Sequence, residues 1–248
     1  MKIQNILAIM ILGGCASAVW IAPPDITSNI IDTGKYRLQT YSRISDTTSP
    51  IHIYIEGDGN SFDAYGHPTS DPTPRGTLLR DMMTQDTAAN VAYIARPCQY
   101  VMSEQCTLTD WTTGRFAPAI IESVANAIQK IAQNRDIILI GYSGGALISG
   151  LIINQYPQIN IKQWITIAGV LNHHDWTEYF GDVPLTESAD LTALPDIPQI
   201  HYIAPRDSVV PNSLSKKWTR GKSLISVPNA RHHKFPNFEI NFTELDKH

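Results

Sequence analysis

The sequence predicts an α/β fold, in which a mostly parallel sheet carries helices on both faces. Short apolar stretches rich in β-branched residues alternate along the chain with stretches whose apolar residues recur at helical spacing. That alternation is typical of parallel strands joined by helices. The 248 residues are 43% hydrophobic and 17% charged, which fits a single globular domain with a sizeable core.

The N-terminus is expected to be a targeting segment rather than part of the fold. Lys2 precedes a short apolar stretch at residues 3–12. The following Leu12-Gly13-Gly14-Cys15 resembles the lipobox of bacterial lipoproteins. This resemblance implies that residues 1–14 are a signal peptide and that a lipid on Cys15 anchors the protein in the bacterial cell envelope.

The residues after Cys15 refine this expectation. Ala16, rather than Asp, favours the outer membrane, with the domain facing the periplasm. The alternative is an ordinary secretory signal that is cleaved near Ala16 or Ala18, so that Cys15 is lost. On the first interpretation, residues 15–33 are a lipidated N-terminus and tether, and residues 34–248 form the domain.

The first half of the domain supplies the outer strands and the first core strands. Residues 20–33 contain prolines and are expected to form a tether or an edge segment, and residues 36–43 partly alternate apolar and polar side chains, as an outer strand does. Residues 50–55 and 90–95 are apolar and β-rich, which predicts buried strands. Residues 77–83 between them have a helical pattern.

The second half repeats the strand–helix alternation. Residues 115–134 carry apolar side chains at helical spacing, so one face of this helix should pack on the sheet. Residues 136–140 and 146–153 indicate a buried strand followed by an apolar helix. The remaining expected elements are strands at 161–168, 200–204 and 223–227, a helix at 211–218, and a longer connection at 171–198 that forms a short cap.

A G-x-S-x-G pentapeptide, Gly141-Tyr142-Ser143-Gly144-Gly145, joins that buried strand to the apolar helix. A strand–turn–helix of this kind holds a serine on a sharp turn and presents its hydroxyl above the edge of the sheet. Ser143 is therefore the candidate nucleophile. A simple glycine-rich turn is the alternative.

A serine nucleophile needs a base to take its proton, and the base needs an acid to orient it. Asp207 follows the strand at 200–204, and His232 follows the strand at 223–227. They are the candidate acid and base, in the chain order serine, acid, histidine. Asp175 is the rival acid, and His233 is the rival base.

Backbone N–H groups must stabilise the oxyanion of a tetrahedral intermediate. Gly144 supplies one candidate N–H at the start of a helix. Asp58 supplies the other, because Gly57 and Gly59 on either side let the backbone approach a ligand. A plain turn is the alternative for this loop. Ser143, Asp207, His232 and Asp58 each follow the carboxyl end of a strand, where ligands bind in such sheets.

The remaining polar and cysteine residues restrict the possible partners. The net charge of −4 gives no electrostatic reason to expect nucleic acid. Cys98 and Cys106 lie eight positions apart and are expected to form a disulfide, stabilising the chain by roughly 2–3 kcal/mol. The segment 99–105 between them is polar and is expected to be exposed. No cluster has a convincing metal-ligand spacing, so neither a metal nor another cofactor is expected.

The mature chain resembles the α/β-hydrolase superfamily and, more narrowly, a group of bacterial lipoprotein α/β-hydrolases. The segments that carry the resemblance are Tyr54-Ile55-Glu56-Gly57-Asp58-Gly59, Asp71-Pro72-Thr73-Pro74, Ala95-Arg96-Pro97-Cys98-Gln99-Tyr100, residues 111–116, Gly141 to Gly145, and residues 204–211. The resemblance implies that Ser143, Asp207 and His232 form a catalytic triad and that Asp58 and Gly144 form the oxyanion hole.

The implied activity is that of a serine hydrolase cleaving a small-molecule or lipid carboxylic ester through an acyl-enzyme. The alternative is a non-catalytic surface lipoprotein that uses the fold as a binding module. Two departures from the family pattern bear on the site: Glu56 replaces a histidine that often precedes the oxyanion glycine, and Gly144 replaces a bulkier residue.

Five large side chains have two interpretations each. Arg96 and Arg115 are expected either to bind an anionic substrate group or to hold loops by pairing with carboxylates. Trp111 and Trp176, like Trp218, are expected either to line an acyl pocket or to pack in the core.

Overall fold

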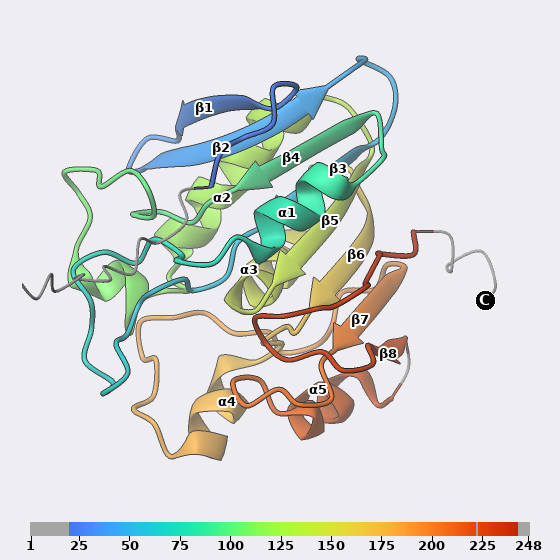
Figure 1. The fold of residues 1–248 in the computed structure, drawn as a ribbon. Helices are drawn as coiled ribbons and strands as arrows, with labels where there is room; N and C mark the ends of the chain where they lie inside the picture. Colours follow the sequence, from blue (N-terminus) through green and yellow to red (C-terminus); the bar gives the residue numbers. More distant parts are fainter. Residues whose placement is uncertain (1–19, 222, 243–248) are drawn as a thin grey trace, which may run out of the picture.

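The computed structural model describes residues 20–221 and 223–242, which form an eight-stranded sheet with helices around it (Figure 1). The strands are β1 (Thr27–Asp32), β2 (Arg37–Ile44), β3 (Ile51–Ile55), β4 (Asn90–Ile94), β5 (Ile137–Tyr142), β6 (Ile161–Ile167), β7 (Gln199–Ile203) and β8 (Leu224–Ser226). The helices are α1 (Leu78–Gln85), α2 (Pro118–Ala132), α3 (Gly144–Gln155), α4 (His173–Phe180) and α5 (Asn212–Thr219), with a short 3₁₀ helix at Leu108–Trp111.

The sheet is parallel except at one edge. Its strand order is β1-β2-β4-β3-β5-β6-β7-β8, and the strands from β4 to β8 in this order all pair in parallel. β1 and β2 are antiparallel to their neighbours. In the central strand β3, Tyr54 lies between Tyr93 of β4 and Ile140 of β5. The mostly parallel sheet expected from the sequence is confirmed.

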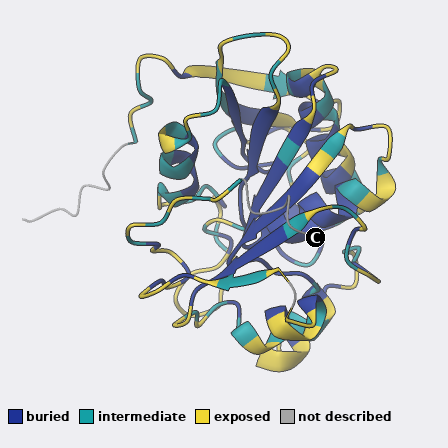
Figure 2. Ribbon diagram, turned by 90° about the vertical axis from the view of Figure 1, so that its right-hand side faces the viewer, coloured by how far each residue is buried: buried dark blue, intermediate teal, exposed yellow. Residues whose placement is uncertain are grey.

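Side chains of the central strands alternate between two cores, as the period of two in a strand requires. Ile53 faces the core that contains Ile128 of α2 and Ile148 of α3. Tyr54 faces the opposite core, with Met83 of α1 and Phe235 of the C-terminal segment. Helices therefore cover both faces. Figure 2 shows the buried residues concentrated in the central strands, while most residues of the outermost strand β1 are exposed.

The chain joins the sheet earlier than the predicted boundary at residue 34. β1 pairs with β2 along its whole length, so part of the segment 20–33 is an edge strand rather than a tether. Before it, the Trp20 indole packs on Tyr41 with ring centroids 4.8 Å apart and donates to Asp81 of α1 at 3.0 Å. The signal peptide and Cys15 lie outside the described residues.

The predicted cap at residues 171–198 contains a helix that the sequence pattern did not reveal. α4 begins after Asn172, whose side chain accepts the Asp175 backbone N–H at 2.7 Å, and ends at Gly181 in the left-handed conformation. The helix is short and contains few apolar residues, so its sequence does not show a helical period. No helix of the described chain is long and apolar enough to cross a membrane.

Cys98 and Cys106 form a disulfide with their Cα atoms 5.9 Å apart. The expectation that the intervening segment is exposed is only partly right. Glu104 and Gln105 are exposed, but the side chain of Gln99 is 1% exposed. Gln99 is buried because it hydrogen-bonds to the loop after β3, a contact between distant segments that a local pattern cannot indicate.

Candidate active site

Ser143 lies on a tight turn between β5 and α3. Its φ of 51° and ψ of −123° are strained for a residue with a Cβ. The turn is held by the backbone on both sides. The Ser143 N–H donates to Ile167 O at 3.0 Å, and the Ser143 carbonyl accepts from Ala146 N at 3.1 Å and Val170 N at 3.0 Å. The strain thus persists because neighbouring strands fix the turn.

The glycines of the pentapeptide are required by close backbone approaches. A Cβ on Gly141 would lie 2.5 Å from Ala146 Cα. A Cβ on Gly145 would overlap the Ile55 carbonyl oxygen and lie 2.6 Å from that of Glu56. Helix α3 can therefore pack this tightly against the ends of β3 and β5 only because these positions lack side chains.

Ser143, His232 and Asp207 form one chain of hydrogen bonds. His232 Nε2 lies 3.0 Å from Ser143 Oγ, and His232 Nδ1 lies 2.9 Å from Asp207 Oδ2. The side chains of His232 and Asp207 are 4% and 1% exposed. Asp207 is oriented by its other oxygen, because Oδ1 accepts the N–H groups of Val209 and Val210, each at 2.8 Å. This arrangement can move a proton away from the serine hydroxyl.

The two rival residues make other contacts. His233 Nδ1 lies 2.9 Å from the hydroxyl of Tyr142, which also donates to the His232 carbonyl at 3.0 Å. His233 thus supports the loop that carries His232, with the two rings edge to face at 4.7 Å. Asp175 lies on α4, where its Oδ2 accepts from Trp218 at 2.8 Å and pairs with Lys217 at 2.7 Å.

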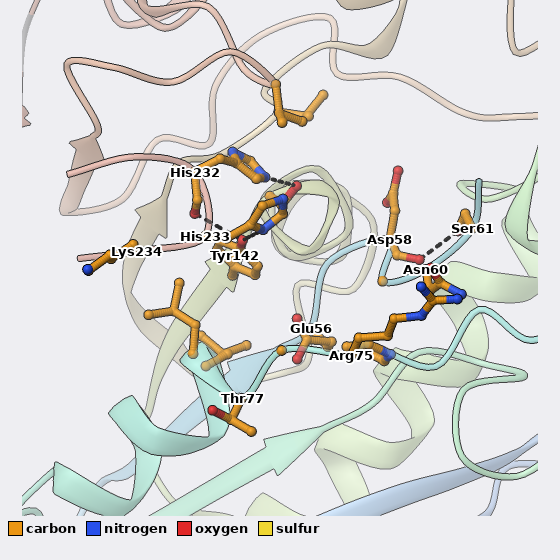
Figure 3. A pocket seen from close by; sticks show the side chains of 18 of the residues that line it. Glu56, Asp58, Asn60, Ser61, Arg75, Thr77, Tyr142, His232, His233 and Lys234 are labelled. Carbon is orange, nitrogen blue, oxygen red and sulfur yellow. Dashed lines mark hydrogen bonds between the residues drawn. The ribbon is translucent and has the colours of Figure 1, made fainter. Parts of the chain in front are cut away.

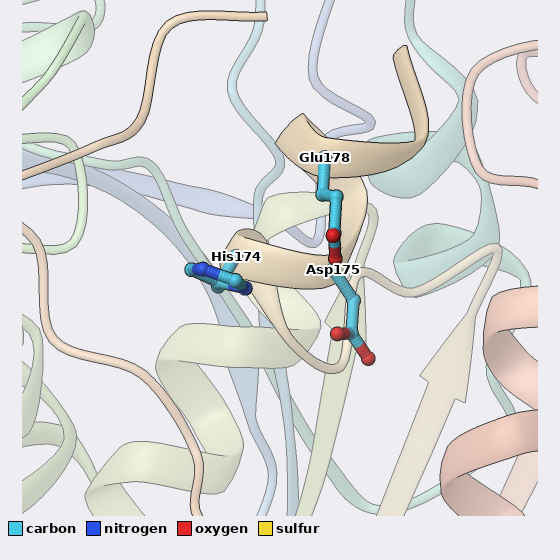
Figure 4. A group of neighbouring side chains, drawn as sticks. All are labelled: His174, Asp175 and Glu178. Carbon is cyan, nitrogen blue, oxygen red and sulfur yellow. The ribbon is translucent and has the colours of Figure 1, made fainter. Parts of the chain in front are cut away.

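Asp175 also belongs to a cluster with His174 and Glu178 on α4, shown in Figure 4. The potential ligand atoms of the three side chains lie within 4.8 Å of one another. His174 and Glu178 are exposed, and the Asp175 carboxylate already joins α4 to α5 through Lys217. We therefore interpret the cluster as part of the contact between these helices and assign no metal to it.

The Asp58 carboxylate holds the loop after β3 against the turn of Ser143. It pairs with Arg96 through one oxygen and with Arg115 through the other, the latter at 3.3 Å. Arg96 also donates to the Arg115 carbonyl. A Cβ on Gly144 would lie 2.9 Å from Asp58 Cγ. The absence of a side chain at Gly144 therefore makes room for the Asp58 side chain. Of the two roles expected for the arginines, the structure shows the pairing with a carboxylate that holds loops.

Further hydrogen bonds, made by the buried side chains of Gln99, Glu56 and Tyr93, fix the same loop. Gln99 Nε2 donates to the Gly57 carbonyl at 2.9 Å. The Gly57 N–H donates to Glu56 Oε1 at 2.8 Å, and the Tyr93 hydroxyl donates to Glu56 Oε2 at 2.9 Å. Burial raises the pKa of Glu56 and outweighs the opposing effect of these donors and of nearby arginines. Glu56 thus supports the loop through both of its carboxylate oxygens.

The backbone N–H groups of Asp58 and Gly144 remain unused. Neither donates to an acceptor within the described part of the chain. They belong to the two segments that meet where Asp58 lies against Gly144, beside Ser143. Two free donors next to a serine hydroxyl match the requirement for stabilising an oxyanion.

A cavity of about 810 Å³ opens beside Ser143 and His232 (Figure 3). Much of its wall is apolar and aromatic, including Phe62, Phe116, Val170, Trp176 and Val209. Of the three tryptophans expected either here or in the core, Trp176 lines this cavity. Trp111 instead donates to the Thr69 carbonyl at 3.0 Å, and Trp218 binds Asp175. Phe62, Phe116 and both valines were not singled out from the sequence, although Phe116 and Val209 lie within segments that carry the resemblance.

The sequence matches no protein-family model and no curated protein. Solved structures share its fold. An α/β serine hydrolase homologue from Coxiella burnetii aligns with a TM-score of 0.54 at 14% identity, over 86% of this chain and 91% of that one. Est1E from Butyrivibrio proteoclasticus aligns with a TM-score of 0.55 at 14% identity, over 83% and 90%.

A third structure shares the same fold. XC6422 from Xanthomonas campestris, described as an α/β serine hydrolase without a lid, aligns with a TM-score of 0.53 at 11% identity, over 86% of this chain and 88% of that one. These alignments cover 83–86% of this chain at TM-scores above 0.5, which shows a shared fold. The chain therefore has the fold of the α/β-hydrolase superfamily.

Proposed function

We propose that the protein is a serine hydrolase that cleaves carboxylic esters through an acyl-enzyme. The observation that carries this proposal is the hydrogen-bonded chain from Ser143 Oγ to His232 and Asp207, at 3.0 and 2.9 Å. It is supported by the two unused backbone N–H groups and by the apolar cavity beside them.

In the first half-reaction, Ser143 Oγ gives its proton to His232 Nε2 and attacks the ester carbonyl carbon. The resulting oxyanion accepts hydrogen bonds from the N–H groups of Asp58 and Gly144, worth roughly 3–4 kcal/mol each. Asp207 stabilises the imidazolium form of His232. When the tetrahedral intermediate collapses, the ester C–O bond breaks, and His232 returns the proton to the leaving alcohol.

In the second half-reaction, water replaces the alcohol. His232 takes a proton from the water, whose oxygen attacks the acyl-enzyme carbonyl. The same N–H groups stabilise the second oxyanion. Its collapse releases the carboxylic acid and returns the proton to Ser143, so the enzyme is regenerated without a cofactor.

The substrate class follows from the cavity. Its aromatic and aliphatic wall suits an acyl chain or another apolar group, so we propose a small-molecule or lipid ester. We also propose that Cys15 carries the lipid implied by the lipobox, which would hold the enzyme at the membrane of the cell envelope.

The first test combines turnover of p-nitrophenyl esters with labelling by a fluorophosphonate, read as covalent mass on each peptide. We expect wild type to be labelled at Ser143 only. Ser143→Ala and His232→Ala should remain folded, lose labelling, and lose at least about 10³-fold in kcat. Asp175→Asn is the matched control for the rival acid and should keep labelling.

Full turnover in Ser143→Ala would contradict the proposal. A folded wild type that is neither labelled nor active would instead support the alternative, a binding module built on the same fold.

A further inference from the structure

Large apolar side chains are exposed mainly at one end of the molecule. Of the ten that are exposed in the described chain, seven lie in connections that follow the carboxyl ends of strands β3, β4 and β6. These seven are Phe62, Tyr65, Met102, Leu108, Tyr179, Phe180 and Val183. Ile30 and Ile44, by contrast, lie on the antiparallel edge strands. The exposed apolar surface is thus concentrated at the end that carries Ser143.

Five of the seven form what we call the aromatic rim: Phe62, Tyr65, Tyr179, Phe180 and Val183. The rim is continuous with the cavity wall. Phe62 and Trp176 both line the cavity, and the Arg115 guanidinium lies over their rings at 5.6 and 5.4 Å. The Trp176 ring in turn contacts Phe180 at 5.5 Å. Exposed rings therefore begin where the cavity lining ends.

The rim residues are presented by ordered backbone. Phe62 pairs with Pro68 in an isolated bridge, and the Thr69 N–H donates to the Ser61 carbonyl at 2.9 Å, so Tyr65 lies at the tip of a closed loop. Tyr65 is 86% exposed there. On the other side, Val183 follows the capped end of α4 and is 74% exposed. Holding such side chains in water is unfavourable, which points to a partner that covers them.

The start of the described chain indicates which partner this is. Trp20 is fixed to α1 by its bond to Asp81, which itself lines the cavity. Only four residues separate Trp20 from Cys15, a span of at most about 18 Å. A lipid on Cys15 would therefore hold the bilayer close to the wall of the cavity that α1 provides.

We propose that the aromatic rim lies in the interface of a lipid bilayer, so that the cavity receives its substrate from the membrane. Tyr and Phe side chains favour this region because their rings are apolar and the tyrosine hydroxyl reaches water. Delivery of a substrate from the membrane rests on the proposed hydrolase function, whereas binding of the rim to the bilayer does not. A second copy bound over Phe62 would cover the cavity, which makes a dimer the poorer occupant.

The charges around the rim favour apolar insertion over electrostatic attraction. Arg75 and Lys234 line the cavity, while the acidic residues Asp63, Glu178 and Asp182 lie within a few positions of rim residues, Glu178 on helix α4. Because both signs are present, attraction to anionic lipid should contribute little. Binding should then depend weakly on salt, unlike that of a basic surface.

The test uses residues 16–248, since residues 20–242 contain the whole sheet and both cores. Co-flotation is measured with vesicles of phosphatidylethanolamine and phosphatidylglycerol at a ratio of about 3:1, in about 0.1 and 0.5 M NaCl. We expect the double variant Tyr65→Ser, Phe180→Ser to bind about 10–100-fold more weakly. The matched control Ile30→Ser, Ile44→Ser should bind like wild type, and the higher salt should weaken binding less than about threefold.

Equal losses in the two double variants, no binding by the parent chain, or loss of binding in high salt would each overturn the proposal. So would a concentration-dependent dimer in sedimentation that the Tyr65→Ser, Phe180→Ser variant abolishes, because it would assign the rim to self-association. Ser143→Ala should bind vesicles like wild type, and the rim variant should keep fluorophosphonate labelling without vesicles. Failure of membrane binding and failure of the hydrolase function are therefore distinguishable.

Discussion

The turn of Ser143 and the loop Glu56–Gly59 lie against each other, yet different forces hold them. The turn is fixed by backbone hydrogen bonds and by glycines that let main chains touch. The loop is fixed by buried side chains, namely the Asp58 carboxylate between Arg96 and Arg115, and Gln99 on the Gly57 carbonyl. One region depends on the absence of side chains, and the other depends on the ion pairs and hydrogen bonds that side chains make.

This difference determines how each region should respond to substitution. Close backbone packing leaves no room for adjustment, so an added methyl group should disturb the whole elbow. A network of charged side chains retains partial contacts when one member is lost, so its failure should be graded and should affect catalysis before folding. Three substitutions separate these behaviours.

The largest effect is expected where the two regions touch, at Gly145. In Gly145→Ala the new methyl group would overlap the Ile55 carbonyl oxygen and lie 2.6 Å from that of Glu56, both backbone atoms. We expect the free energy of unfolding to fall by about 3–5 kcal/mol, measured by urea denaturation. Gly76→Ala is the matched control, because a Cβ there meets nothing within 4 Å. Similar stabilities for the two variants would show that the elbow is not tightly packed.

The same contrast explains how much of the site the sequence could predict. The turn of Ser143 was predictable because its signal is local: a buried strand, a G-x-S-x-G pentapeptide and an apolar helix in succession. Asp58 and Gly144 were expected at the same edge of the sheet because each follows the carboxyl end of a predicted strand. The strands β3 to β8 were found because their apolar runs are short and clearly bounded, whereas β1 was expected only as part of a tether or edge segment.

The side-chain contacts that hold the loop Glu56–Gly59 could not be predicted in detail. Arg96 reaches Asp58 across 38 positions, and the sequence left open whether it binds a substrate or a carboxylate. Gln99 was expected to be exposed because its neighbours are polar, yet its amide is buried against Gly57. Local polarity does not reveal a partner that the fold brings from another strand. Position alone favoured Asp207 and His232, and the structure shows that His232, rather than His233, lies within hydrogen-bond distance of Ser143.

A smaller effect on stability, with a larger effect on catalysis, is expected at Arg96. Arg96→Met leaves Asp58 with Arg115 alone and removes a donor from the Arg115 carbonyl. Because the Asp58 side chain is 25% exposed, we expect the free energy of unfolding to fall by about 2–3 kcal/mol, which is small for the loss of one partner of a buried ion pair. The Asp58 N–H should lose its position, so kcat should fall about 10–100-fold while KM changes less than about threefold.

Arg96→Lys provides the conservative comparison. Lysine keeps the charge but cannot bind Asp58 and the Arg115 carbonyl with one planar group, so it should recover only part of kcat. Arg206→Met, at an exposed position, is the control for loss of an arginine. If KM rises and kcat stays constant in Arg96→Met, the arginine binds substrate instead of positioning the loop.

The smallest effect is expected at Glu56, which tests whether every charge in the loop matters. Burial raises the pKa of Glu56, so the folded protein favours its neutral form more than the unfolded chain does. Glu56→Gln resembles that neutral form and can still accept the Gly57 N–H, so kcat should stay within about threefold of wild type. Raising the pH ionises Glu56 in the unfolded chain first, so wild type should lose stability relative to Glu56→Gln as pH rises from about 4. Urea denaturation at several pH values measures this, with exposed Glu104→Gln as the control. The opposite trend would mean that Glu56 is an ionised partner of Arg96, and that the loop is held by two carboxylates instead of one.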